Sequence, residues 1–151
     1  MAGAAGTDLH RASCRPAPAR RRGLLPGGRQ DPSDADLEAT ALREAREEIA
    51  LEPAAVEVVG ALPPVSTFVT GYRIQPFVGL VADPGGLDLE PNPAEVETVL
   101  AFTLERLREG YEMRRLIRRG VPIHTPTYEV EGQMIWGATA RILGDFLKRV
   151  D

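Results

Sequence analysis

The sequence predicts an α/β domain in which helices pack on a mixed β-sheet. Its 151 residues are 43% hydrophobic and 26% charged, which is enough apolar material for one globular domain with a core of its own. Segments with the period of amphipathic helices alternate with short apolar segments of strand character. Several of the short apolar segments are spaced like the paired strands of hairpins. Helices interspersed with such pairs favour a mixed sheet with helices packed on it.

The composition excludes several classes of protein. The net charge of −4 gives no basic surface of the kind that nucleic acid requires. No apolar run approaches the roughly 20 residues that span a bilayer. The single cysteine, Cys14, rules out an internal disulfide framework and fits a reducing compartment. We therefore expect a cytoplasmic protein that binds neither nucleic acid nor a membrane.

The first 26 residues differ from the rest of the chain. They are rich in Ala, Arg, Pro and Gly, and Asp8 is their only acidic residue. They show neither the strand period nor a sustained helix period. We expect residues 1–25 to be a disordered or non-native segment and the domain to span residues 26–151. An organelle transit peptide is the less favoured interpretation of this Arg-rich, acid-poor stretch.

The first element of the expected domain is a helix at residues 36–49. The polar segment before it offers Asp34 or Asp36 as an N-terminal cap. Pro53 prevents the helix from continuing.

Short strands and two further helices should follow this helix. We expect strands at 56–60, 67–82 and 97–102, a short helix at 104–108, a hairpin of strands 122–127 and 128–135 that turns near Glu131 and Gly132, and a last helix at 136–148. Pro76 would place its strand near a sheet edge. The last helix would bury one apolar stripe made of Ala138, Ile142, Leu143 and Phe146.

Three glutamates of the first helix share one flank. Glu44, Glu47 and Glu48 stand at positions i, i+3 and i+4, within an arc of about 100°. Like charges at these spacings cost a helix roughly 0.2–0.5 kcal/mol per pair, and a divalent cation would reverse that sign. The neighbouring apolar stripe is formed by Leu37, Ala41, Ala45 and Ile49, with Glu48 at its border. The alternative is a solvated helix face on which Arg43 and Arg46 neutralise the acids.

The stretch "GGRQDPSDADLEATALREAREEIAL" resembles a Nudix box, G-x(5)-E-x(7)-R-E-U-x-E-E-x-G-U, where U is aliphatic. The half from Arg43 to Leu51 matches, except that Ala50 replaces glycine and Ala45 is a small U. Asp34 stands where the early glutamate belongs, six positions after Gly28, but Arg43 follows it by nine positions and not eight. This spacing resembles the coenzyme A diphosphatase branch of the Nudix hydrolases. The downstream segments "TGYRIQPFVGLV", "PNPAEVETVLAFTLERL" and "IWGATARIL" are similar to that branch in the same order.

The resemblance implies an α/β/α sandwich with a mixed sheet, in which the box forms a loop, a helix and a second loop. It covers roughly residues 26–149 and fails upstream. The branch has a His-x-Gly element and a strand before the box, and neither is found in "LHRASCRPAPARRRGLLPGG". We therefore expect the fold to lack an N-terminal strand, and we expect Met1 to Leu25 to reflect a wrong start or a reading-frame slip.

The function implied by the resemblance is hydrolysis of the pyrophosphate of coenzyme A or its derivatives to 3′,5′-ADP and 4′-phosphopantetheine. Mg²⁺ or Mn²⁺ would bind chiefly to Glu44 and Glu48, while Glu47 would complete the site or act as the base. Arg43 would orient a glutamate. Gly27 and Gly28 would let the loop approach the metal and substrate.

Other residues have weaker claims to the site. Glu95 and Glu97 are candidates for a general base from outside the box, although a solvated loop would also explain them. His124 is expected to be a structural or surface residue, Trp136 a packing residue at the start of the last helix, and Tyr72 a sheet residue. Two other functions stay open: a Nudix hydrolase for another nucleoside diphosphate derivative, and a catalytically silent domain that binds a nucleotide or a partner protein. A homodimer is also left open.

Overall fold

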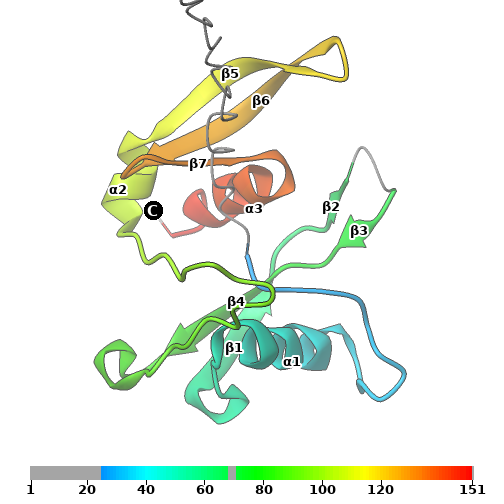
Figure 1. The fold of residues 1–151 in the computed structure, drawn as a ribbon, viewed down its shortest axis with the longest axis vertical. Coiled ribbons are helices and arrows are strands. Elements are labelled where there is room, and N and C mark those ends of the chain that lie inside the picture. The colour runs from blue at the N-terminus through cyan, green and yellow to red at the C-terminus, as the bar shows by residue number, and fades with distance from the viewer. Residues whose placement is uncertain (1–24, 68–70, 151) are drawn as a thin grey trace, which may run out of the picture.

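The computed structural model describes residues 25–67 and 71–150, so the expected non-native segment at 1–25 lies outside the described residues except for Leu25. Figure 1 shows the arrangement of the elements. In chain order these are α1 (Leu37–Ile49), the 3₁₀ turn η1 (Pro53–Ala55), β1 (Val56–Ala61), β2 (Val65–Ser66), β3 (Arg73–Ile74), β4 (Phe77–Val81), η2 (Pro84–Gly86), α2 (Leu104–Glu109), β5 (Tyr111–Arg118), β6 (Val121–Val130), β7 (Gln133–Trp136) and α3 (Gly137–Leu147).

The strands form three small sheets, and every ladder within residues 25–67 and 71–150 is antiparallel. β1 pairs with β4, β2 pairs with β3, and β5, β6 and β7 form a meander. The single mixed sheet that we expected is therefore not formed by the described residues. The reason is that each described strand pairs with one that runs the opposite way: β2 and β3 lie between β1 and β4 in the chain, and β5, β6 and β7 follow one another through tight turns.

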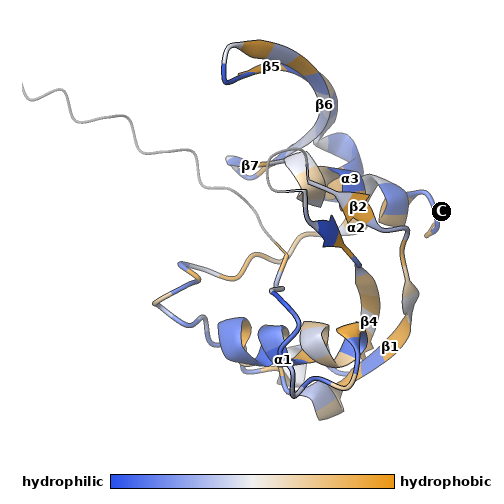
Figure 2. Ribbon diagram, turned by 90° about the vertical axis from the view of Figure 1, so that its right-hand side faces the viewer, coloured by the Kyte–Doolittle hydropathy of each residue, from blue (hydrophilic) through white to orange (hydrophobic). Residues whose placement is uncertain are grey.

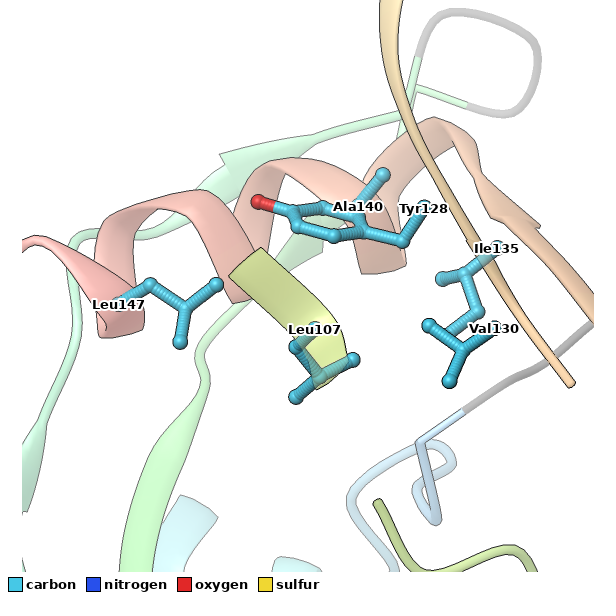
Figure 3. Close-up of a cluster of buried hydrophobic side chains, with 6 residues drawn as sticks. All are labelled: Leu107, Tyr128, Val130, Ile135, Ala140 and Leu147. Atoms are coloured by element: carbon cyan, nitrogen blue, oxygen red, sulfur yellow. The ribbon is translucent and has the colours of Figure 1, made fainter. Parts of the chain in front are cut away.

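The core lies between α3 and the three-stranded sheet (Figure 1). Figure 3 shows its six buried side chains: Leu107, Tyr128, Val130, Ile135, Ala140 and Leu147. The residues predicted for the apolar stripe of the last helix all contribute. Ile142 is buried, and Ala138, Leu143 and Phe146 are partly buried against the core. A second cluster joins Ile142 to Leu62 and Val65, so α3 also contacts the β2–β3 hairpin.

The predicted helices are confirmed with small changes of boundary. Asp36 caps α1 by accepting a hydrogen bond from the Ala39 amide at 2.8 Å. α1 ends at Ala50, which adopts the left-handed conformation (φ 56°) and donates to the carbonyls of Ala45 and Arg46. Of the predicted apolar stripe, Ala45 is buried but Leu37 is exposed, because Leu37 is the first residue of the helix. No helix in residues 25–67 or 71–150 is long and apolar enough to cross a membrane.

Three predictions about strands are wrong. Residues 97–102 join no ladder within the described chain, and their apolar character instead brings Phe102 against the core. The strand predicted at 67–82 is divided into β3 and β4 by Gln75 and Pro76, and residues 68–70 lie outside the described residues. The predicted hairpin also has a different division. β6 continues through Thr127 to Val130, although the turn at Glu131 and Gly132 is confirmed by their positive φ angles.

Candidate active site

The candidate site is built on α1 and on the loop that precedes it. α1 is largely hydrophilic (Figure 2), and its acidic flank lies beside residues 27–34. Asp34 does not cap the helix. It accepts hydrogen bonds from the hydroxyl of buried Thr40 at 2.9 Å and from the Asp31 amide at 2.9 Å. These bonds fix the loop against the first turn of α1.

Arg43 connects that loop to two of the glutamates. Its Nε lies 2.9 Å from one oxygen of Asp34, and its Nη2 lies 3.0 Å from the Arg29 carbonyl. Its Nη1 lies 3.0 Å from both Glu44 Oε1 and Glu47 Oε2. The i, i+4 pairing with Glu47 is thus present, but it belongs to a larger network that also fixes the direction of Glu44.

Gly28 lies directly against the carboxylate of Glu44. A Cβ atom at position 28 would stand 2.2 Å from Glu44 Oε1 and 2.4 Å from its Cδ, which no side chain could tolerate without displacing that carboxylate. The Glu44 side chain is only 14% exposed and is held by Arg43. Glycine is therefore required at position 28 if Glu44 is to keep its place.

Glu48 lies where α1 meets the loop that carries Glu95. It is partly buried, and it accepts a hydrogen bond from the Gly27 backbone amide. The main chain brings Glu95 close to it. The Asn92 amide donates to the Glu48 carbonyl at 2.8 Å, and the Glu95 amide donates to the Asn92 carbonyl at 3.0 Å. The sequence-based candidate Glu95 therefore lies near the box glutamates, although it comes from a distant loop.

The surroundings of Glu48 and Asp34 shift the pKa values of these two acids in opposite directions. Burial raises the pKa of Glu48, and the negative charges of Glu44, Glu95 and Glu47 raise it further, against the opposing effect of the Gly27 amide. At the other end, hydrogen bonds from Arg43 and from the Asp31 amide lower the pKa of Asp34 to about 2. Asp34 is thus stabilised as an anion, whereas the surroundings of Glu48 disfavour its charged form.

The residue types around Glu48 fit a hard divalent cation. Such ions prefer carboxylate oxygens, and a cation would relieve the repulsion that raises the pKa of Glu48. In this structure the acids are not yet assembled around one point. Within the described ranges, no three Asp, Glu, His or Cys side chains come close enough together to hold an ion as they stand. Glu44 and Glu47 instead point to Arg43, so their carboxylates would have to rotate about side-chain torsions toward Glu48.

The structure also separates the weaker candidates. His124 is exposed in β6 opposite Arg115, away from α1. Trp136 precedes α3, and the Arg118 guanidinium lies 5.5 Å from its ring. Glu97 is exposed. Tyr72 lies just before β3 and not within it, so the expectation of a sheet residue is wrong.

Two neighbours of the site were not found from the sequence. Buried Thr40 holds Asp34, and the Arg29 guanidinium lies 4.7 Å from the ring of Tyr72. Thr40 lies six positions after Asp34, near the start of α1. The contact between them could therefore have been anticipated, because Asp34 was expected beside the start of this helix. The Arg29–Tyr72 contact joins distant parts of the chain and has no signal in the local sequence.

Comparison with known proteins gives the family. A family model described as the NUDIX domain matches residues 9–120. An uncharacterized Nudix hydrolase, NudL, from Citrobacter koseri is 41% identical over 128 residues, which cover 83% of this chain and 65% of the relative. Proteins of the same name from Salmonella paratyphi B and Salmonella newport are 40% identical over 128 residues with the same coverage.

The chain thus spans 65% of the length of these curated relatives. The matched residues include the whole loop and helix on which Arg43 and the three glutamates lie. This match extends over most of the chain, and the identity to the relatives is high. The chain belongs to the NUDIX domain family.

Proposed function

We propose that this protein hydrolyses the diphosphate linkage of a nucleotide derivative, with coenzyme A or one of its thioesters as the substrate. The observation that carries the proposal is the grouping of Glu44, Glu47 and Glu48 on one flank of α1, where Glu48 is joined by main-chain hydrogen bonds to the loop that carries Glu95. A diphosphate is itself strongly anionic, so it would bind beside these acids only with a cation between them. The spacing from Gly28 through Asp34 to Arg43 supports coenzyme A as the substrate through its resemblance to that branch.

In this proposal Glu44 and Glu48 are the chief ligands of Mg²⁺ or Mn²⁺, and Glu47 completes the set. A divalent ion bound there would neutralise the diphosphate and make a coordinated water more acidic. Arg43 holds Glu44 and Glu47 in the direction set by Asp34. Gly28 leaves room for the Glu44 carboxylate beside the loop.

The reaction adds water across the phosphoanhydride. One P–O bond to the bridging oxygen breaks, and the water oxygen forms a new bond to the attacked phosphorus. Both products are phosphate monoesters, which for coenzyme A are 3′,5′-ADP and 4′-phosphopantetheine. Glu95 is the best placed acceptor for the proton of the attacking water, because it lies close to Glu48 and its side chain is exposed to solvent. Glu47 is the alternative base.

The test is product release from coenzyme A by the purified protein with Mg²⁺ or Mn²⁺, followed by chromatography. We expect 3′,5′-ADP with the wild type, and we expect Glu48→Gln to lose at least ~100-fold in kcat/KM, equivalent to about 3 kcal/mol of transition-state stabilisation. Release from another nucleoside diphosphate derivative, but not from coenzyme A, would replace the substrate in this proposal.

A catalytically silent domain is the competing function, and one observation favours it. Glu44 and Glu47 are paired with Arg43 and are not gathered around Glu48. A silent domain would show no metal-dependent turnover of any diphosphate in a substrate panel. Its nucleotide binding would also be unaffected by Glu48→Gln.

A further inference from the structure

Arg29 and Tyr72 form a contact at the rim of the candidate site. The guanidinium carbon of Arg29 lies 4.7 Å from the centre of the Tyr72 ring. Arg29 follows Gly28, where an added Cβ atom would collide with the Glu44 carboxylate. Its own carbonyl accepts a hydrogen bond from Arg43 Nη2 at 3.0 Å. The backbone of Arg29 is therefore fixed to the same network that orients the glutamates.

The contact contributes little to the stability of the fold. Arg29 is exposed, and Tyr72 is 47% exposed. An exposed cation–π contact contributes only about 0.5–1 kcal/mol. Both side chains are thus accessible from solvent, and the backbone of Arg29 is bonded to Arg43, the residue that pairs with Glu44 and Glu47.

The charge of Arg29 is not used by the protein itself. Within residues 25–67 and 71–150, no carboxylate forms an ion pair with its guanidinium, although Asp34, Glu44 and Glu47 all pair with nearby Arg43. The planar guanidinium is the side chain best suited to bind phosphate oxygens through two parallel hydrogen bonds. Contact with an aromatic ring limits its rotation, so less entropy is lost when a phosphate binds.

We infer that Arg29 binds a phosphate group of the substrate and that Tyr72 is the positioning residue for its guanidinium. The inference rests on the proposed function and deepens it. It assigns the loop after Gly28 to substrate recognition and leaves metal binding to the acids of α1. The phosphate could be part of the diphosphate or a separate monoester such as the 3′-phosphate of coenzyme A. Both offer the same oxygen atoms to Arg29.

The test compares steady-state kinetics of Arg29→Gln with the wild type on coenzyme A and on dephospho-coenzyme A. We expect KM for coenzyme A to rise by about tenfold or more, the usual effect of losing a charge-assisted hydrogen bond, with kcat changed less than about twofold. An equal rise for both substrates would assign the contact to the diphosphate. A rise for coenzyme A alone would assign it to the 3′-monoester.

The role of Tyr72 requires its own variants. Tyr72→Leu removes the ring and should raise KM by about threefold to fivefold, whereas Tyr72→Phe keeps the ring and should restore the wild-type KM. Once Arg29 is Gln, adding Tyr72→Leu should have little further effect, because the ring acts through the guanidinium. Additive effects of the two substitutions would overturn the positioning role.

Arg106→Gln is the matched control. Arg106 is exposed on α2, far from α1 (Figure 1), where it pairs only weakly with Glu109 at 3.6 Å. The Arg106→Gln substitution removes the same charge as Arg29→Gln, and it should leave KM unchanged.

If the wild type turns over coenzyme A but Arg29→Gln has the wild-type KM on both substrates, the inference is wrong and the proposed function stands. If the wild type hydrolyses no diphosphate, the proposed function fails. In that case calorimetry with coenzyme A, which carries both the diphosphate and the 3′-monoester, decides the inference, since wild-type and Arg29→Gln affinities that agree within about twofold would overturn it.

Discussion

Arg43 and Asp34 form a forked ion pair in which Nε and Nη2 lie 2.9 and 3.1 Å from the two carboxylate oxygens. The Asp34 side chain is only 6% exposed, so this pair joins the loop to α1 in a site that water barely reaches. The fork leaves Nη1 of Arg43 free to contact Glu44 and Glu47 at 3.0 Å. The position of both glutamates therefore depends on a residue nine or more positions earlier in the chain.

The first prediction concerns the stability of the fold in acid. Because the pKa of Asp34 is lowered to about 2 from the ordinary 3.8, its contribution is fully present above pH 3.8 and is lost as the pH falls through about 2. We expect the free energy of unfolding of Asp34→Asn, measured in urea, to be lower than that of the wild type at pH 6. This difference should largely disappear at pH 2. Asp88→Asn, a change in an exposed loop, is the control. An Asp34→Asn deficit that is the same at both pH values would contradict the ion pair.

The second prediction concerns the pH dependence of metal binding. Since the pKa of Glu48 is raised, protons compete with Mn²⁺ at a higher pH than at an ordinary glutamate, and affinity should rise as the pH increases through the Glu48 pKa. Glu95→Gln removes one of the charges that raise this pKa. It should therefore move the midpoint of Mn²⁺ affinity, followed by calorimetry, to lower pH. A midpoint that stays fixed would show that Glu95 does not face Glu48 in solution.

The third prediction concerns Gly28. A methyl group at this position would occupy the place of the Glu44 carboxylate, so Gly28→Ala should weaken Mn²⁺ binding by about tenfold or more and lower kcat, while the free energy of unfolding changes little. Gly60→Ala is the control, because a Cβ there would meet nothing within 4 Å. Wild-type metal affinity in Gly28→Ala would mean that Glu44 does not bind the metal from its place beside Gly28.

The fourth prediction concerns the end of α1. Ala50 has φ 56°, a conformation that glycine adopts without the steric penalty of a Cβ atom. We expect Ala50→Gly to stabilise the protein by about 0.5–1 kcal/mol, which would raise Tm by about 1–4 °C. Ala41→Gly, within the same helix, should instead destabilise it by about 1 kcal/mol. Calorimetric melting of both variants measures the two opposite shifts.

Local patterns were sufficient to predict the helices and one tight turn. The cap at Asp36, the end of α1 before Pro53 and the turn at Glu131 and Gly132 all follow from residue types at fixed spacings. The flank shared by the three glutamates also follows from helix geometry. The placement of Glu95 near them was predicted only through the family resemblance, because it depends on hydrogen bonds between distant main-chain groups.

The strands were predicted less well for a physical reason. β5 carries three arginines in eight residues and is exposed along one face, so its sequence alone lacks the apolar alternation of a half-buried strand. It is a strand because β6 pairs with it along its whole length. Residues 97–102 are more apolar, yet they have no partner strand in the described chain. Pairing is a tertiary property, and composition does not determine it.

The loop that carries Glu95 is joined to α1 through peptide groups, which donate from Glu90 to Ile49 and from Asn92 to Glu48. Peptide groups are the same in every amino acid except proline, so this junction does not constrain which side chains evolve around it. Homologous enzymes could therefore vary the chemistry displayed at position 95 while inheriting its location. The location of this position and the side chain that fills it would then be governed by separate parts of the same short segment.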